Sequence, residues 1–494
     1  MELLASLKMS PSLLMALAML IPLAGALLIC VTSRWPNLRE TMTLLTALSL
    51  FACVLGLLPS ILAGESPQLL ILEFLPDLPL LLVLEPLGML FALIASGLWI
   101  INSLYSIGYM RGNNEAHQTG FYICFAIALA ATMGIAMAGN LLTLFLFYEA
   151  LTFSTYPLVT HKRNANALAG GRRYLGYLLA SSLILLMTAI VLTYVIGGSI
   201  RFTPEGILAG KLDSSTGALL LALYVFGIGK AGLMPIHRWL PAAMVAPTPV
   251  SALLHAVAVV KAGVFCVVKI IIYVFGLETL RGADWAGWLV YAASFTVITA
   301  SVIALYQDNL KRRLAYSTIS QLGYVVLAAA VLAPLSMLGA VVHIAAHAVS
   351  KITLFFAAGA IYTASKKTEV SQLNGIGRAM PWTMTAFAIG SLSMIGLPPT
   401  VGFTSKWYML GGALDSGQLF VVVVLLVSTL LNAGYYLPIV YRAFINEPDK
   451  ALKHGEAPWP SVVALTLTAA GTIVLFFYPQ PVIKLAQLLL GSTS

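Results

Sequence analysis

Three protonatable side chains recur at every fourth position in the segment HIAAHAVSKITLFF, namely His343, His347 and Lys351. In an α-helix this spacing stacks the three groups along one face over about 12 Å. Imidazoles titrate near neutral pH, so such a row can pass a proton when its members lie within hydrogen-bond or one-water reach. An isolated membrane histidine more often forms an interhelical hydrogen bond, but three groups in register predict a proton relay.

A single carboxylate lies in the middle of the apolar segment LLTLFLFYEALTFSTYPLV, at Glu149. It follows Asn140 of a Gly-Asn turn by nine residues, which places it about 13 to 14 Å into a helix, near the centre of a bilayer. A charge at that depth costs about 2.5 to 3.5 kcal/mol even on insertion scales. Glu149 must therefore face a hydrated interior, pair with a cation or hold a proton.

Lysines at similar depth are the candidate partners of this carboxylate. Lys230 and Lys261 lie deep in two later apolar runs. An ammonium beside a carboxylate stabilises both charged forms while desolvation opposes them, so a small change in their separation can move a proton. The alternative is a static ion pair that fixes helix packing. His255 precedes Lys261 by six residues, a poor spacing for one helix face, so His255 needs a local break or a different neighbour.

Two apolar runs are interrupted beside a lysine in the same way. Glycines and a proline surround Lys230 in GIGKAGLMPIHRWLP, and they precede Lys406 in SMIGLPPTVGFTSKWYML. Broken helices at corresponding places of two halves are typical of inverted-repeat transporters whose site lies near the midplane. Helix packing could explain either break alone, because Gly and Pro are common in membrane helices. A further lysine, Lys269, is the weakest member of the set and could be structural.

The composition requires a membrane to position these groups. Of the 494 residues, 60% are hydrophobic and 9% charged, whereas a soluble domain carries about 25% charged residues. The apolar runs are too long and too continuous for the alternating strands of a transmembrane barrel. We expect an all-α polytopic protein of about fourteen spans, with no linker long enough for a soluble domain. The expected spans are 12–31, 41–62, 80–106, 120–138, 141–160, 174–197, 217–236, 247–275, 285–306, 313–334, 337–362, 382–410, 418–446 and 460–480.

Loop charge predicts the orientation of the spans. Basic residues such as Arg34, Arg111 and Lys311 follow odd-numbered spans, whereas acids such as Glu65 and Glu278 lie in the other loops. The positive-inside rule then places both termini on the outer face. The first apolar run has no convincing small-residue cleavage site, so we expect a retained span rather than a signal peptide.

Sequence motifs for metals, cofactors and nucleic acids are not found. The four cysteines are far apart, without CxxC spacing, and no HExxH glutamate accompanies the two histidines four residues apart. We find no GxxxxGK[ST] run, glycine-rich dinucleotide turn or hydrolase triad. The basic residues behind the net charge of +9 lie mostly in short loops between spans, so the membrane topology explains this charge. We expect no cofactor, no metal and no nucleic acid partner.

The segments that carry these ionisable residues resemble a known superfamily over residues 80–445. They are similar to the proton-translocating antiporter-like subunits shared by respiratory complex I, membrane-bound hydrogenases and multisubunit Mrp antiporters. The segments are FYEALTFSTYPLV, GKAGLMPIHRWLPAAMVAPTPVSALLHAVAVVKAGVF, KRRLAYSTISQLGY, HIAAHAVSKITLFFAAGAI and IGLPPTVGFTSKW.

The resemblance implies a division of the chain and a role for each residue. The N-terminal helices are expected in 1–119, two inverted five-helix repeats in 120–280 and 285–445, and the last helix in 446–494. The seventh and twelfth helices are then the broken ones. Glu149 and Lys230 match the proton-entry pair, Lys261 the lysine of the eighth helix and Lys406 the exit residue. The connecting hydrophilic axis contains His255, His343, His347 and Lys351.

Within this superfamily the chain is most similar to Mrp D subunits, because positions 261 and 406 are both lysine and no long lateral helix follows the last span. This similarity implies a proton-translocating subunit of a sodium, or other monovalent cation, antiporter in a bacterial plasma membrane. Such a subunit is a secondary transporter component rather than an enzyme, and it assembles with other membrane subunits. One alternative is a proton-pumping subunit of complex I or a hydrogenase. Another is a structural membrane scaffold that carries no ion flux.

Overall fold

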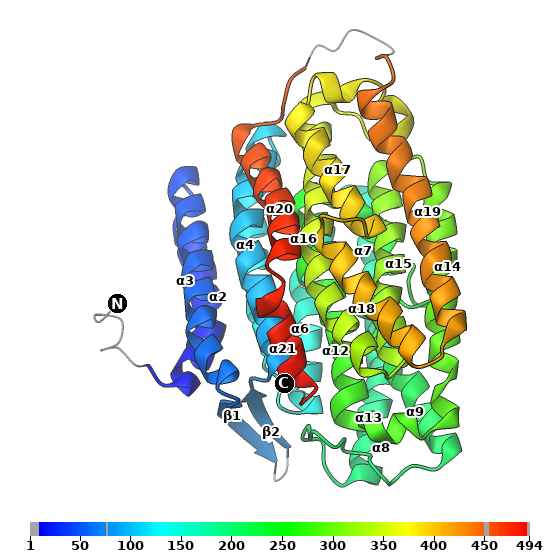
Figure 1. Cartoon of the computed structure of the whole chain (residues 1–494). Helices are drawn as coiled ribbons and strands as arrows, with labels where there is room; N and C mark the ends of the chain where they lie inside the picture. The colour runs from blue at the N-terminus through cyan, green and yellow to red at the C-terminus, as the bar shows by residue number, and fades with distance from the viewer. Residues whose placement is uncertain (1–8, 76–77, 449–453, 492–494) are drawn as a thin grey trace.

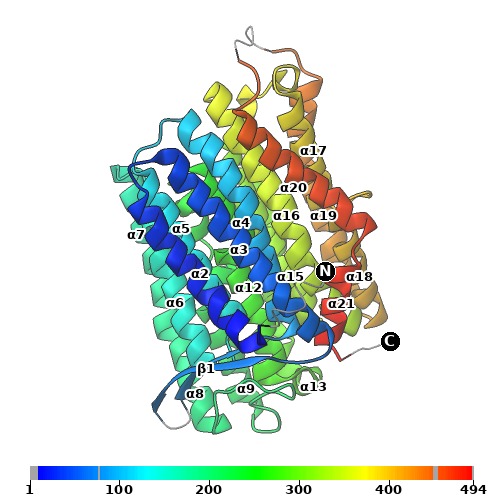
Figure 2. The same cartoon turned by 90° about the vertical axis from the view of Figure 1, so that its left-hand side faces the viewer.

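The computed structural model describes residues 9–75, 78–448 and 454–491. It confirms an all-α membrane architecture of long helices packed side by side, with α2 and α3 at one edge of the bundle (Figures 1 and 2). We call one end of the bundle the hairpin face, because strands β1 (Gln68–Leu75) and β2 (Leu78–Val83) lie there (Figure 1). The opposite end is called the basic face, because Arg111 at the end of α4 lies there.

Helices make up most of the described chain, and several begin at a polar residue whose side chain accepts a backbone N–H, as at Asn140, Asn164 and Asn309. The earlier helices are α2 (Pro11–Val31), α3 (Pro36–Leu62), α4 (Pro86–Gly112), α5 (Gln118–Ala136), α6 (Leu141–Val159), α7 (Ala165–Ala180), η1 (Ser181–Leu186), α8 (Met187–Gly197), α9 (Ser214–Gly227), η2 (Gly229–Ala231), α10 (Trp239–Ala242), η3 (Ala243–Val245), α11 (Thr248–Ala252), η4 (Leu253–Val257), α12 (Val259–Ile270), η5 (Ile271–Phe275), α13 (Leu277–Arg281) and η6 (Asp284–Ala286). The later helices are α14 (Trp288–Leu305), α15 (Leu310–Ala330), α16 (Pro334–Ser365), η7 (Val370–Gln372), η8 (Ile376–Arg378), α17 (Pro381–Ile395), α18 (Val401–Asp415), α19 (Leu419–Phe444), α20 (Trp459–Phe477) and α21 (Gln480–Leu489).

Both predicted helix breaks are confirmed. Helix α9 ends at Gly227, and the chain continues as the short turn η2 before Gly232, whose φ is +68°. Helix α17 ends at Ile395, directly before Gly396, whose φ is +92°, and α18 begins at Val401. Glycine adopts positive φ without steric cost, so the sequence itself specifies where these helices stop.

Ten of the described helices, α7 to α8 counted as one, are long and apolar enough to cross a membrane. Four predicted spans are not among them, and each has a physical reason. Three are divided into short helices, namely 217–236, 247–275 and 382–410, and the fourth, 313–334, corresponds to the more polar α15. The count of about fourteen spans therefore stays a prediction.

The hairpin of β1 and β2 was not expected from the sequence. The strands pair antiparallel, with Gln68 opposite Val83 and Leu69 opposite Leu82. The predicted third span began at residue 80, whereas α4 begins at Pro86. The run LPLLLV is too short and too uniformly apolar for its periodicity to separate a strand from the start of a helix. The backbone N–H of Val83 donates to Met137, so β2 is fixed against the end of α5.

Helix α16 is the centre of the second half of the chain. It packs against α15, α17, α18, α20, α4 and α11, and almost every residue of Ser336–Ile361 is buried. A polar group on this helix has protein on all sides, so it must find a partner inside the bundle. This position explains why His343, His347 and Lys351 are not at the lipid boundary.

Candidate functional site

Lys230 lies in the break after α9 and is completely buried. Its Nζ donates to the backbone O of Tyr148 at 2.9 Å and to Oγ1 of Thr152 at 2.5 Å, both on α6. The same Nζ lies 3.2 Å from the centre of the Tyr148 ring. Gly263 of α12 makes room for this turn, since a Cβ there would lie 2.2 Å from the carbonyl carbon of Lys230.

Glu149 is nine-tenths buried on α6, between the two partners of Lys230. Within the described part of the chain neither carboxyl oxygen has a hydrogen-bond partner. No ion pair among the described residues joins Glu149 to Lys230 or Lys261, so the expected contact is not formed in this arrangement. Lys230 instead donates to the backbone carbonyl of Tyr148, the residue directly before Glu149. Burying a carboxylate without a partner at this depth is costly, and a bound proton or nearby water lowers that cost.

Lys261 and His347 are in direct contact. The Nζ of Lys261 on α12 lies 2.6 Å from Nδ1 of His347 on α16, and both side chains are completely buried. An ammonium and an imidazolium have no acceptor, so a hydrogen bond here needs one of the two groups to be neutral. The pair therefore holds at least one neutral group, either the amine or the imidazole.

His343 continues the row by one helical turn, and its ring centre lies 6.1 Å from that of His347. Its Nε2 lies 3.0 Å from Oε1 of Gln321, and its Nδ1 lies 2.8 Å from Oγ of Ser405. The Ser405 hydroxyl also lies 3.0 Å from the backbone O of Gly402. Since a hydroxyl has a single proton to donate, it serves either the imidazole or the carbonyl. The protonation of His343 is thus coupled to the first turn of α18.

Lys406 lies at the second break, and its position follows from the open carbonyls there. Its Nζ donates to the backbone O of Met394 at 3.0 Å and of Ile395 at 2.9 Å, at the end of α17. A helix C-terminus favours a cation because its last carbonyls lack intrahelical partners. The Nζ also lies 4.6 Å from the centre of the Tyr324 ring, and the Tyr324 ring lies 5.9 Å from that of His343.

Lys351 forms a branch rather than a link of this row. Its Nζ donates to Oγ of Ser317 at 2.8 Å and to the hydroxyl of Tyr436 at 3.0 Å. Tyr435 extends the branch along α19, since its hydroxyl contacts Ser317 at 3.3 Å and also bonds to Asn432. The lysine therefore points toward α15 and α19, away from the contact between α12 and α16.

Comparison with known proteins decides the family. Residues 138–432 match the family model described as NADH:quinone oxidoreductase/Mrp antiporter, TM. The chain belongs to this family. NADH-quinone oxidoreductase subunit N of Desulforudis audaxviator is 31% identical over 458 residues, which are 87% of this chain and 88% of that protein. Na(+)/H(+) antiporter subunit A1 of Staphylococcus aureus is 32% identical over 380 residues, which are 73% of this chain and 45% of that protein.

Solved structures agree on the fold. A chain in the structure of the Mrp complex from Dietzia sp. DQ12-45-1b matches with a TM-score of 0.87 and 21% identity, over 97% of this chain and 96% of that one. A chain of the membrane-bound sulfane sulfur reductase, an archaeal respiratory membrane complex, matches with a TM-score of 0.83 and 23% identity, over 96% of both chains. At these identities the similarity concerns the fold alone.

Two members of the predicted set remain to be placed on this family fold. The side chain of His255 lies outside the described residues, although its backbone belongs to the π-helical turn η4. A π-helical turn is a local break in a regular helix, and the part of His255 in the hydrophilic axis stays a prediction. Lys269 forms an ion pair with Glu85, whose Oε2 lies 2.9 Å from Nζ. Sequence reasoning missed Glu85, although a carboxylate within the predicted span 80–106 was a visible signal.

Proposed function

We propose that this chain is the proton-translocating subunit of a multisubunit sodium/proton antiporter and resembles the D subunit of an Mrp complex. The contact that carries the proposal is the 2.6 Å approach of Lys261 Nζ to His347 Nδ1. It lies inside a buried row of ionisable groups that reaches from α12 to α18. Such groups are costly at membrane depth and mark proton pathways.

The proton moves along this row by a series of local exchanges. The ammonium of Lys261 gives a proton to Nδ1 of His347, which leaves a neutral amine and an imidazolium. Water between the two imidazoles carries the proton to His343, where Ser405 changes its hydrogen-bond partner. Lys406, held by the carbonyls at the end of α17, receives the proton. It then releases the proton to a water-filled path in the second repeat, 285–445.

Proton entry depends on Glu149 and Lys230 in the first half. In the described arrangement Lys230 is held by Tyr148 and Thr152, so Glu149 is free to take up a proton. A swing of the Lys230 ammonium toward Glu149 favours the carboxylate and drives the proton onward. The two groups form a gate with an open and a closed arrangement.

The proposed orientation follows the loop charges, with the basic face in the cytoplasm and the hairpin face outside. The proposed division of the chain keeps the N-terminal helices in 1–119, the inverted repeats in 120–280 and 285–445, and the C-terminal end in 446–494, which holds α20 and α21 rather than a single helix. Sodium passes through neighbouring membrane subunits of the complex, because hard cations need clustered oxygen ligands. The chain itself is a transport subunit and transfers only protons.

A second candidate function is the proton-pumping subunit of a redox complex. The 31% identity over 458 residues with NADH-quinone oxidoreductase subunit N favours it. The same buried row would serve, but electron transfer elsewhere in the complex would drive it.

The experiment that separates the two functions uses the intact complex in proteoliposomes that contain a pH-sensitive dye. We expect a sodium gradient alone to drive proton movement. Substitution Lys261→Arg should abolish this movement, because a guanidinium stays protonated. Proton movement that requires an electron donor and ignores sodium would favour the redox complex. Full sodium-driven movement in Lys261→Arg would contradict the proposed pathway.

A further inference from the structure

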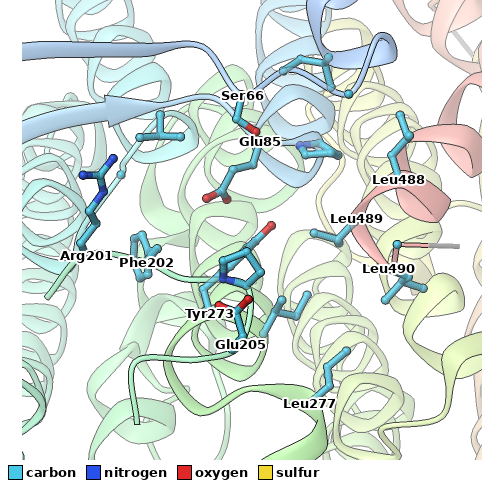
Figure 3. A pocket seen from close by; sticks show the side chains of 18 of the residues that line it. Ser66, Glu85, Arg201, Phe202, Glu205, Tyr273, Leu277, Leu488, Leu489 and Leu490 are labelled. Atoms are coloured by element: carbon cyan, nitrogen blue, oxygen red, sulfur yellow. The ribbon is translucent and has the colours of Figure 1, made fainter. Parts of the chain in front are cut away.

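A cavity of about 890 Å³ opens on the hairpin face of the first half (Figure 3). Its lining includes Glu65, Glu85, Arg201, Glu205, Tyr273 and Glu278. Glu85, Tyr273 and Glu205 surround its centre, Arg201 lies at one side, and Leu488 to Leu490 lie at the other (Figure 3). Four carboxyl groups and one arginine line the cavity. Glu85 pairs with Lys269 and Glu278 pairs with Arg281, which leaves Glu65 and Glu205 opposite Arg201 and a small excess of negative charge that favours cations and protons.

An ion pair lies at the inner wall of this cavity. Oε2 of Glu85 accepts from Nζ of Lys269 at 2.9 Å. The Lys269 side chain is 0% exposed and the Glu85 side chain is 12% exposed, so the carboxylate separates the buried ammonium from the cavity. The rings of Phe202, Phe265 and Tyr273 lie 4.7, 5.7 and 5.4 Å from the Lys269 Nζ. Glu85 is therefore the group through which a proton on Lys269 can reach water.

Helix α12 connects this ion pair to the central axis. Lys261 and Lys269 are both on α12, eight residues apart, which is about 12 Å along the helix. Lys261 contacts His347 at 2.6 Å, whereas Lys269 contacts Glu85 near the hairpin face. A single helix thus carries one lysine on the axis and one at the cavity.

We propose that this cavity is a proton port of the first half, with Lys269 as the proton-carrying group and Glu85 as the group that exchanges the proton with cavity water. The proposal rests on the proposed function above and adds a site to it. In the step, an N–H bond of the Lys269 ammonium breaks and an O–H bond forms on Oε2 of Glu85, which leaves a neutral amine and a neutral carboxyl. Glu85 then gives the proton to cavity water. The same steps in reverse order bring a proton from cavity water to Glu85 and then to the neutral Lys269 amine, so the port exchanges protons in either direction.

If the Glu85–Lys269 pair only held the structure together, its side chains would need different properties from those of a proton port. A structural pair needs one fixed positive and one fixed negative charge, and an arginine supplies the fixed positive charge. A port needs a cation that can lose its proton, and a guanidinium in a protein does not. The substitution Lys269→Arg therefore keeps the ion pair and removes the proton step.

The test compares variants of the intact complex in proteoliposomes, with proton flux as the readout. We expect Lys269→Arg and Glu85→Gln to assemble and to lose flux by about a hundredfold, the lower end of the contribution of a positioned proton-transfer group. Glu85→Asp, which keeps a carboxyl, should recover part of the flux. The matched controls are Lys484→Arg and Glu73→Gln, which change exposed side chains outside the cavity and should leave the flux unchanged.

The outcomes separate the port from the function on which it rests. Normal flux in an assembled Lys269→Arg complex would overturn the port. If that variant does not assemble, normal flux in Glu85→Gln overturns the port, and lost flux that Glu85→Asp recovers supports it. Glu149→Gln is measured alongside. Loss of flux in Glu149→Gln with normal flux at the port variants rejects the port alone, whereas normal flux in all of them rejects both proposals.

Discussion

The amine of Lys261 and the imidazole of His347 face each other across two helices, with Nζ 2.6 Å from Nδ1. Both are completely buried, and neither can accept a hydrogen bond once it is protonated. The contact therefore exists only while the pair holds fewer protons than its two basic groups could bind. A contact of this kind is what the proposed proton relay requires of the two groups.

The first prediction concerns His347. His347→Gln keeps a hydrogen-bonding side chain at this position but cannot take up a proton, so we expect loss of proton flux with retained assembly. The flux should fall by about a hundredfold, as for other positioned acid–base groups. The control is Ser461→Ala, a buried change at the packing contact between α20 and α4, where the hydroxyl bonds Tyr105. Equal flux in His347→Gln and the unchanged protein would contradict a relay through this imidazole.

The second prediction concerns Glu149. Because neither carboxyl oxygen has a partner among the described residues, Glu149→Gln removes no protein hydrogen bond and avoids a charge in the bundle. We expect the melting temperature of the complex to stay equal or rise, while the proton flux is lost. The measurement pairs thermal unfolding with flux on the same preparation. A large drop in melting temperature would instead indicate that the carboxylate has a structural partner.

The third prediction concerns pH and His161, which lies just after α6 on the basic face. Burial lowers the pKa of His161, with smaller effects from His117, Arg163 and Lys162, and its ring lies 5.9 Å from that of Phe121. A histidine whose pKa is lowered on folding stabilises the fold above its unfolded pKa of about 6.5, and that stability is lost as the pH falls below this value. We expect the melting temperature to fall between pH 7 and about pH 5, and to fall less in His161→Gln. Identical pH profiles for the two proteins would contradict this prediction.

The sequence was sufficient to predict that the lysines of the apolar runs lie inside the bundle, that His343 and His347 share one helix, and where two helices break. Each of these features depends on local properties of the chain. Gly396 stops α17 through its own backbone conformation, and the spacing of His343 and His347 is fixed by the helix itself. The sequence did not show which residues from distant segments would become hydrogen-bond or ion-pair partners. Glu85 and Lys269 are 184 residues apart, and only the packed fold brings them together. Likewise, Lys230 donates to the Tyr148 carbonyl and not to Glu149 because of the geometry of the helix break.

The last prediction concerns Gly263, where α12 touches the broken segment that carries Lys230. A Cβ at this position would lie 2.2 Å from both the Lys230 carbonyl carbon and the Ala231 nitrogen. Both atoms belong to the backbone, so Gly263→Ala must displace the turn, at a cost of about 1 to 3 kcal/mol or more. The matched control is Gly176→Ala on α7, where a Cβ has nothing within 4 Å. We expect Gly263→Ala to lower the melting temperature and weaken proton flux by moving Lys230, while Gly176→Ala leaves both at or above their normal values. Wild-type stability and flux in Gly263→Ala would show that the turn does not depend on this close approach.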